Sequence, residues 1–289
     1  MILYIITLNK KHILLIFLII SAIICGSATI TTSSSSIKSN KDSTPLLIVM
    51  YHNVLKDTSK CGKYTVTPQL FEQDVQYLIN NGYSFLGCND IIDAVYNHSQ
   101  LPEKPVIITF DDGYYNNYTY IYPILQKYKI KAVISPIAIE AEKFSLSPDP
   151  NPAYSTMTWD NIKEMCDSGH AEVQNHSYNM HRISSDAMGC ADLPGESRQM
   201  YKDRLYADLA KAHRMIAENT TYTPQCMVYP FGMVSKGATE VIQKLGYRMS
   251  LSCTEGISYI TDDNDCLFML KRNNRPYGIS SEEFFGKIK

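Results

Sequence analysis

The stretch that decides the predicted fold is Val106-Ile-Ile-Thr-Phe-Asp-Asp-Gly113. Its uninterrupted apolar half is typical of a strand buried on both faces, and its glycine permits a sharp exit from that strand. Because side chains alternate along a strand, Asp111 and Asp112 can serve one site only where the strand ends. Two neighbouring carboxylates repel each other. The pair therefore indicates either a solvated turn or a site that holds a cation or a shared proton.

Strands and helices are predicted to alternate about seven times along the chain, which is typical of a parallel sheet or an α/β barrel. A barrel of this kind fills a chain of 289 residues as one domain. The predicted strands are 46–51, 83–86, 106–110, 132–136, 171–174, 227–229, 249–252 and 268–270, and a polar loop is predicted over 144–156. The first predicted helix begins at Pro68. Further helices are predicted over 90–96, 118–128, 158–168, 203–219, 238–245 and 281–288.

The composition excludes one class of partner. The net charge is -2 and the pI about 6.4, so nothing indicates binding to nucleic acid. Hydrophobic residues make up 45% of the chain, which is enough to bury a sizeable core.

The N-terminus has the pattern of an export signal. Lys10, Lys11 and His12 precede an apolar run over 13–25, and small residues follow. We expect residues 1–28 to be a signal peptide or an N-terminal anchor, and the short run makes the anchor the second choice. Residues 29–44 form a Ser/Thr-rich linker, and 45–289 the folded domain. The protein is therefore expected to be secreted or attached to the outer face of the cell membrane.

Three polar groups follow predicted strands: Asp111-Asp112, the segment from His176 to His181, and Pro230-Phe231-Gly232. Ligands collect at the carboxyl ends of parallel strands, so these groups are expected to meet. One carboxylate and two imidazoles can hold Zn²⁺ or a similar ion and leave coordination positions open for water and substrate. The second Asp could then act as general base, and backbone amides near 230–232 could stabilise an oxyanion. Hydrolysis of an amide or ester is implied.

The order Thr109-Phe110-Asp111-Asp112-Gly113, followed by His176 and His181, resembles the polysaccharide deacetylases of carbohydrate esterase family 4, the NodB-like deacetylases. The likeness runs from about Pro45 to Leu270 and looks like the exported branch that acts on poly-N-acetylglucosamine and related glycans. It implies a distorted (β/α) barrel and a divalent metal, usually zinc. It also implies removal of N-acetyl groups from amino sugars, or of O-acetyl groups from xylan.

The resemblance implies a role for each site residue. Asp111 would be the catalytic base, and Asp112, His176 and His181 would bind the metal. Pro230 and Phe231 match the Pro-Tyr-Gly part of a family motif whose backbone supports the oxyanion.

The chain departs from the family pattern in three places, and the first two concern the histidines and the base. The histidines are five residues apart where four is usual, so His181 can reach a metal only from a loop or bulge, and Asn179 is the alternative ligand. Val228 stands where an Arg usually orients the base. We expect Arg272, in the Leu270-Lys271-Arg272 segment that continues from the last predicted strand, to supply that charge.

The family's late catalytic-acid histidine is missing near Leu270. His52 follows another predicted strand, where it could replace that acid or serve only as a hydrogen-bonding group; a metal-bound water is the other candidate acid. The sequence thus predicts a metal-dependent deacetylase of an acetylated polysaccharide. The alternatives are a glycan-binding protein that has lost turnover and a hydrolase of non-sugar amides on the same barrel.

Overall fold

The computed structural model describes residues 43–184 and 187–288. The chain divides into two units, Met1–Lys41 and Asp42–Lys289, and every described element belongs to the second. The predicted signal peptide or anchor, and nearly all of the predicted linker, lie outside the described residues. Within the described residues no helix has both the length and the apolar character that a membrane span requires.

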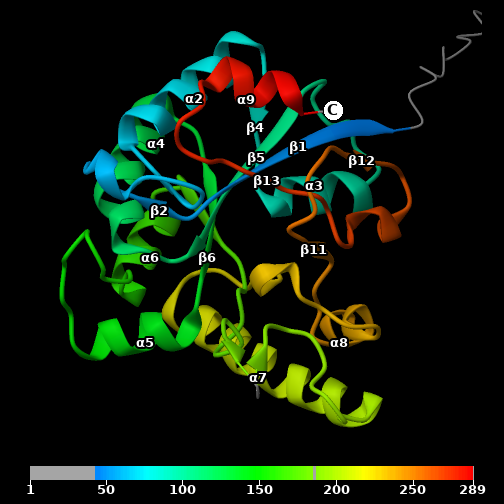
Figure 1. The fold of residues 1–289 in the computed structure, drawn as a ribbon. Coiled ribbons are helices and arrows are strands. Elements are labelled where there is room, and N and C mark those ends of the chain that lie inside the picture. Colours follow the sequence, from blue (N-terminus) through cyan, green and yellow to red (C-terminus); the bar gives the residue numbers. More distant parts are fainter. Residues whose placement is uncertain (1–42, 185–186, 289) are drawn as a thin grey trace, which may run out of the picture. The chain divides into compact units, whose positions relative to one another are not determined.

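Four neighbouring parallel strands form the centre of the molecule (Figure 1). They are β1 (Thr44–Tyr51), β5 (Pro105–Asp112), β6 (Ala132–Pro136) and β7 (Ala171–Val173). Two shorter strands flank them: β12 (Ser258–Ile260) pairs antiparallel with β1, and β4 (Ser84–Phe85) pairs with the start of β5.

Three more strands continue the ring. The strands β10 (Cys226–Val228) and β11 (Met249–Leu251) pair in parallel, and β13 (Asn273–Asn274) pairs in parallel with β1. Single bridges join these pieces, Asn175 to Met227 and Leu251 to Leu270. The order β1-β5-β6-β7-β10-β11-β13 and back to β1 is a distorted barrel of parallel strands, as predicted.

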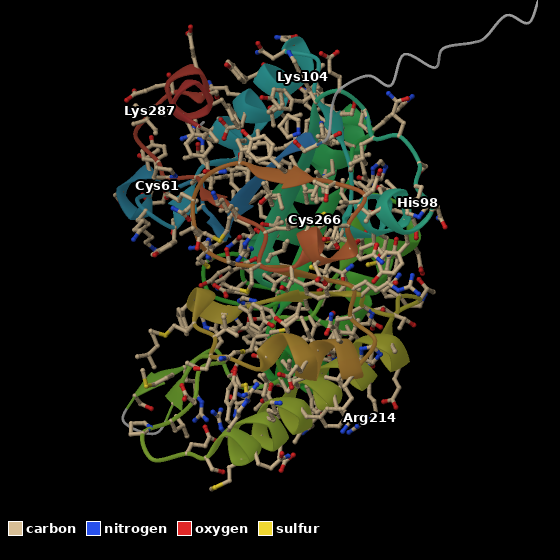
Figure 2. All side chains as sticks on the ribbon, turned by 90° about the vertical axis from the view of Figure 1, so that its right-hand side faces the viewer. Cys61, His98, Lys104, Arg214, Cys266 and Lys287 are labelled. Carbon is tan, nitrogen blue, oxygen red and sulfur yellow. The ribbon has the colours of Figure 1, made fainter. Side chains whose placement is uncertain are left out.

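The central strands are buried on both faces, as their uninterrupted apolar sequence predicts. Val49 and Ile108 pack into one hydrophobic cluster, while Ile48 and Ile107 pack into another on the opposite face. Charged side chains such as Lys104 and Arg214 lie on the outside (Figure 2).

Helices cover the strands. They are α2 (Pro68–Asn80), α3 (Cys88–Tyr96), α4 (Tyr122–Tyr128), α5 (Ala138–Leu146), α6 (Trp159–Asp167), α7 (Arg198–Asn219), α8 (Ala238–Lys244) and α9 (Ser281–Lys287). Two of them begin as the sequence indicates: the Thr67 side chain accepts from Leu70 N, and Thr158 accepts from Asn161 N.

Three predicted elements need correction. The loop predicted over 144–156 begins too early, because α5 continues to Leu146. The helix predicted over 118–128 opens instead with a π-turn, Asn117–Ile121, before α4. The strand predicted over 268–270 is wrong: Met269 has φ 61°, which breaks an extended backbone, and only Leu270 makes a bridge.

Candidate active site

The two carboxylates of the opening stretch lie where β5 ends. Asp112 is the last residue of the strand and has φ 69°, and Gly113 follows with φ 78°. This left-handed turn breaks the alternation of the strand, so Asp111 and Asp112 both line one cavity. Left-handed backbone at a non-glycine residue is strained, and such strain tends to gather at functional sites.

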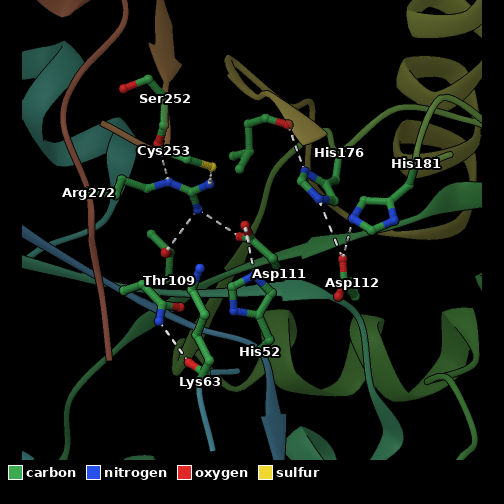
Figure 3. Close-up of polar contacts among 12 residues, drawn as sticks. His52, Lys63, Thr109, Asp111, Asp112, His176, His181, Ser252, Cys253 and Arg272 are labelled. Atoms are coloured by element: carbon green, nitrogen blue, oxygen red, sulfur yellow. Dashed lines mark hydrogen bonds and ion pairs between the residues drawn. The ribbon is translucent and has the colours of Figure 1, made fainter. Parts of the chain in front are cut away.

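His176 follows β7 and is fully oriented by the backbone of the next strand. Its Nδ1 lies 2.7 Å from the carbonyl oxygen of Val228, which can only accept, so Nδ1 carries the proton. In the neutral ring Nε2 then presents a lone pair, and it lies 3.6 Å from Asp112 Oδ1 (Figure 3). Burial alone would lower the pKa of His176, but the carboxylates of Asp111 and Asp112 outweigh it and raise the pKa.

The five-residue spacing is accommodated by a turn that is not helical. Ser177 has φ 74°, and the backbone amides of Tyr178 and Asn179 donate to the two oxygens of Asp208 on α7, at 2.8 and 3.0 Å. This turn brings His181 Nε2 to 3.1 Å from Asp112 Oδ1. His181 therefore reaches the site from a loop, and Asn179 does not line the cavity.

The donor set fits a divalent cation. One ligand atom each from Asp112, His176 and His181 lies within 4.8 Å of the others. Asp112 Oδ1 is buried and accepts no hydrogen bond from the described residues, although two imidazole nitrogens face it. Acceptors that converge in this way need a proton or a metal ion between them, and N/O donors of this kind suit zinc and its first-row neighbours.

Asp111 belongs to a second group, which is centred on Arg272. Arg272 is fully buried, and its Nη1 donates to Asp111 Oδ1 at 2.8 Å and to the Thr109 hydroxyl at 3.3 Å. Its Nε donates to the Ser252 carbonyl at 2.8 Å. Burial would raise the pKa of Asp111, but Arg272, His176 and His52 outweigh it and hold that pKa well below its usual range. Arg272 therefore lies against the Asp111 carboxylate and pairs its charge with it.

His52 lines the same cavity. The sequence alone did not decide between an acid and a hydrogen-bonding role for it. Its Nε2 lies 4.0 Å from Asp111 Oδ2, and its ring packs on Tyr64 with centroids 5.0 Å apart. Its Nδ1 is buried and has no hydrogen-bond partner among the described residues. Burial lowers the pKa of His52, against the opposing effect of the Asp111 and Asp112 carboxylates.

The third predicted motif forms a turn beside His181. Phe231 has φ 58° and lines the cavity, with its ring centroid 4.2 Å from that of His181, whereas Pro230 is buried behind it. The amides of Gly232 and Met233 donate to Tyr229 and Pro230 within the turn. Proline has no N–H, so the Phe231 amide is the donor of this motif that is left for a ligand.

The cavity has a volume of about 370 Å³, which suits a small-molecule or sugar ligand. Its wall includes residues that the sequence analysis did not single out: Asn53, Lys63, Tyr64, Tyr114, Cys253, Glu255 and Asn274. Tyr114 had a signal in its position directly after Asp-Asp-Gly. Burial and the Asp112 carboxylate raise the pKa of Tyr114 to about 12, so it stays a phenol at neutral pH.

With this geometry in place, comparison with known proteins identifies the family. Residues 98–250, more than half of the chain, match the family described as polysaccharide deacetylase. The chain belongs to the polysaccharide deacetylase family. The matched segment contains Asp111, Asp112, His176 and His181, whereas His52 and Arg272 lie outside it.

Curated relatives carry a specific activity in their names. The chain is 27% identical over 247 residues to the poly-beta-1,6-N-acetyl-D-glucosamine N-deacetylase of Escherichia coli K12, which covers 78% of this chain. The match takes in only 36% of that relative, so the chain spans about a third of its length. The enzyme of the same name from Staphylococcus aureus MRSA252 is 24% identical over 224 residues, with 72% of each chain covered.

Solved structures agree on the fold. A de-N-acetylase from Aggregatibacter actinomycetemcomitans superimposes with a TM-score of 0.69 at 26% identity, and the match covers 83% of this chain and 99% of that one. The Streptococcus pyogenes deacetylase PplD gives a TM-score of 0.69 at 24% identity, with 86% of this chain and 99% of that chain covered.

Proposed function

We propose that this chain is a metal-dependent hydrolase that removes N-acetyl groups, or O-acetyl groups, from an extracellular or cell-wall polysaccharide. A polymer of N-acetylglucosamine is the favoured substrate because relatives from Escherichia coli and Staphylococcus aureus are named for deacetylating one. Export follows from the apolar N-terminal pattern. One observation carries the proposal: three side chains that could hold a metal ion and a separately held carboxylate line one cavity.

The two aspartates have different roles in this proposal. Asp112, His176 and His181 would hold the ion, most simply Zn²⁺, and Val228 fixes the His176 tautomer by accepting its Nδ1–H. The bound ion would polarise the acetyl carbonyl and lower the pKa of a water molecule. Asp111 would be the catalytic base, because Arg272 keeps it ionised and fixes its orientation.

The residues of the cavity account for each proton and charge of the hydrolysis. Asp111 takes a proton from the attacking water as the new C–O bond forms. The Phe231 amide donates to the carbonyl oxygen as negative charge develops there. His52 Nε2 lies 4.0 Å from Asp111 Oδ2, so the proton taken from water would pass from Asp111 to the His52 ring and from that ring to the leaving amine when the C–N bond breaks.

The test is acetate release from β-1,6-linked N-acetylglucosamine oligomers and from acetylxylan. Chelation should abolish release and added Zn²⁺ should restore it. Asp111→Asn should lower the rate by at least about 100-fold, the usual contribution of a general base, without loss of bound metal measured by elemental analysis. His181→Ala should lose the metal itself.

Asp262→Asn serves as the matched control, because that carboxylate is exposed and does not line the catalytic cavity. Wild-type protein that holds metal but releases no acetate from any acetylated glycan would overturn the proposal. Binding of glycans under those conditions would select the glycan-binding alternative, and release from small amides alone would select the non-sugar hydrolase.

A further inference from the structure

The turn that carries both histidines of the candidate metal site is held by the side chain of Asn175. This residue lies just beyond β7, directly precedes His176 and is fully buried. Its Oδ1 accepts a hydrogen bond from the Ser177 amide at 2.7 Å. That bond stabilises the left-handed backbone of Ser177, which has φ 74° and begins the turn between His176 and His181. The directions of the two imidazoles in Figure 3 therefore depend on the Asn175 amide.

The neighbours of Asn175 allow its amide only one orientation. Its Nδ2 donates to the Leu209 carbonyl on α7 at 3.1 Å and to the Tyr247 hydroxyl oxygen at 2.5 Å. A backbone carbonyl only accepts and a backbone N–H only donates, so Leu209 and Ser177 fix which end of the amide is the oxygen. The Tyr247 hydroxyl must then accept from Asn175, and its own proton is left for another acceptor.

His213 on α7 provides that acceptor. Its Nδ1 lies 3.1 Å from the Tyr247 oxygen, and the two rings meet edge to face with centroids 5.4 Å apart. Burial lowers the pKa of His213, so its ring is neutral at neutral pH and accepts through Nδ1. Burial raises the pKa of Tyr247, against the hydrogen bond from Asn175, so the phenol keeps its proton. A continuous chain of hydrogen bonds thus joins α7 to the turn beside the metal ligands.

This chain of hydrogen bonds lies behind the site. Among the described residues that line the catalytic cavity, none belongs to it. Tyr247 is 2% exposed and packs in an apolar cluster with Leu209, where a phenylalanine would occupy nearly the same space. A hydroxyl in such surroundings is destabilising unless its bonds are made. A buried polar network that is fully satisfied holds its members in one geometry.

We propose that Tyr247 is a positioning residue for the metal site, acting through the Asn175 side chain on the turn that carries His176 and His181. This inference rests on the proposed function, because it takes the two histidines as metal ligands. Without the hydroxyl, one N–H of Asn175 is left unpaired in the interior. The amide then turns toward another partner, and its hold on the Ser177 amide weakens.

The experiment titrates the metal-free full chain, prepared with a chelator, with Co²⁺, whose visible absorption reports both binding and ligand geometry. Tyr247→Phe removes only the hydroxyl, and Asn175→Ala removes the amide. Each should raise the Kd for Co²⁺ about tenfold, the lower limit of the usual loss when a group that orients a metal ligand is removed. The losses should not add in the double variant, since Tyr247 acts through Asn175. Two independent structural defects would give additive losses, which would overturn the inference.

A milder variant and a matched control lie on the same helix. His213→Leu removes only the acceptor of the Tyr247 proton and should raise the Kd about threefold, half of the tenfold effect on a free-energy scale. Tyr201→Phe is the control. Tyr201 is 1% exposed in the same apolar cluster as Tyr247, and its hydroxyl donates to the Cys190 carbonyl at 2.8 Å. This variant should keep the wild-type Kd and the wild-type Co²⁺ spectrum.

Hydrogen exchange of the Ser177 amide gives a readout that needs no metal. Because this N–H donates to Asn175, its exchange in metal-free protein should be about tenfold faster in Tyr247→Phe and unchanged in Tyr201→Phe. The inference is overturned if Tyr247→Phe and His213→Leu both keep the Kd and the exchange rate within about twofold of wild type. Faster exchange in Tyr247→Phe, in a protein whose wild type binds no Co²⁺, would support the hold of Tyr247 on the turn and reject the proposed metal-dependent function.

Discussion

Glu172 gives a prediction whose size follows from the structure. It lies on β7, four residues before His176, and only 2% of it is exposed. Its carboxylate accepts from the Asn89 amide at 3.1 Å and from Gln174 Nε2 at 2.6 Å. Burial nevertheless raises its pKa from 4.5 to about 7, although both hydrogen bonds oppose the shift.

The sign of the effect follows from linkage. A carboxylate whose pKa is raised by folding binds its proton more tightly in the native state. Its contribution to stability is therefore complete below pH 4.5 and is lost as the pH rises to about 7. A shift of this size corresponds to about 3 kcal/mol of unfolding free energy, at 1.36 kcal/mol per pKa unit.

Glu172→Gln removes this titration and leaves a neutral side chain of the same shape. We expect the unfolding free energy of the variant, relative to wild type, to rise by about 3 kcal/mol between pH 4.5 and pH 8. Urea unfolding of chelated protein can be followed through Trp159, the only tryptophan in the chain, which is 5% exposed.

Glu103→Gln is the control, because Glu103 is exposed. Its stability should follow the wild-type pH dependence. If the curves of Glu172→Gln and wild type also run parallel from pH 4.5 to pH 8, then Glu172 is ionised throughout and the argument from burial is wrong.

Two further changes test other parts of the structure. Asp208→Ala removes the acceptor for the Tyr178 and Asn179 amides. We expect metal affinity to fall about 10- to 100-fold, which is the usual loss when a group that orients a metal ligand is removed. Titration with a chelator-buffered metal measures the affinity, and an unchanged value would mean that the turn holds without Asp208. Arg275→Met leaves Asp74 buried without its two-bond partner and should lower the unfolding free energy by about 3–5 kcal/mol in urea titrations. Partial recovery in a double variant with Asp74→Asn is expected, and a loss below 1 kcal/mol would show that the pair is not buried in solution.

Much of the fold could be predicted because its signals are local. The apolar run of β5 and the capping residue Thr67 act within a few residues of themselves. The helix α5 gave no such signal, because only Ala138 and Ala141 are buried along it. The seam of the barrel, where single bridges close the ring of strands, could not be predicted either. These bridges join residues that are far apart in the sequence.

The candidate site was also predictable only in part, for the same reason. Asp111 and Asp112 were identified by their position after a buried strand, but nothing local reveals that Asp112 turns into the left-handed region. The placement of His181 depends on Asp208, which is nearly thirty residues away in the chain.

The seam of the barrel has a consequence for dynamics. The chain from Leu270 to Asn274 closes the ring through one bridge to β11 and a two-residue strand against β1. The segment is nevertheless buried and well bonded: Leu270, Arg272 and Asn273 are each at most 5% exposed, and the amides of Leu270 and Arg272 donate to the carbonyls of Ser250 and Thr254. A segment of this kind opens only together with the core around it. Because Arg272 belongs to it, the charge that orients Asp111 is withdrawn only when the ring opens. The fraction of molecules able to work is then the fraction with a closed seam, and amide hydrogen exchange along residues 270–274 should be as slow as in the central strands.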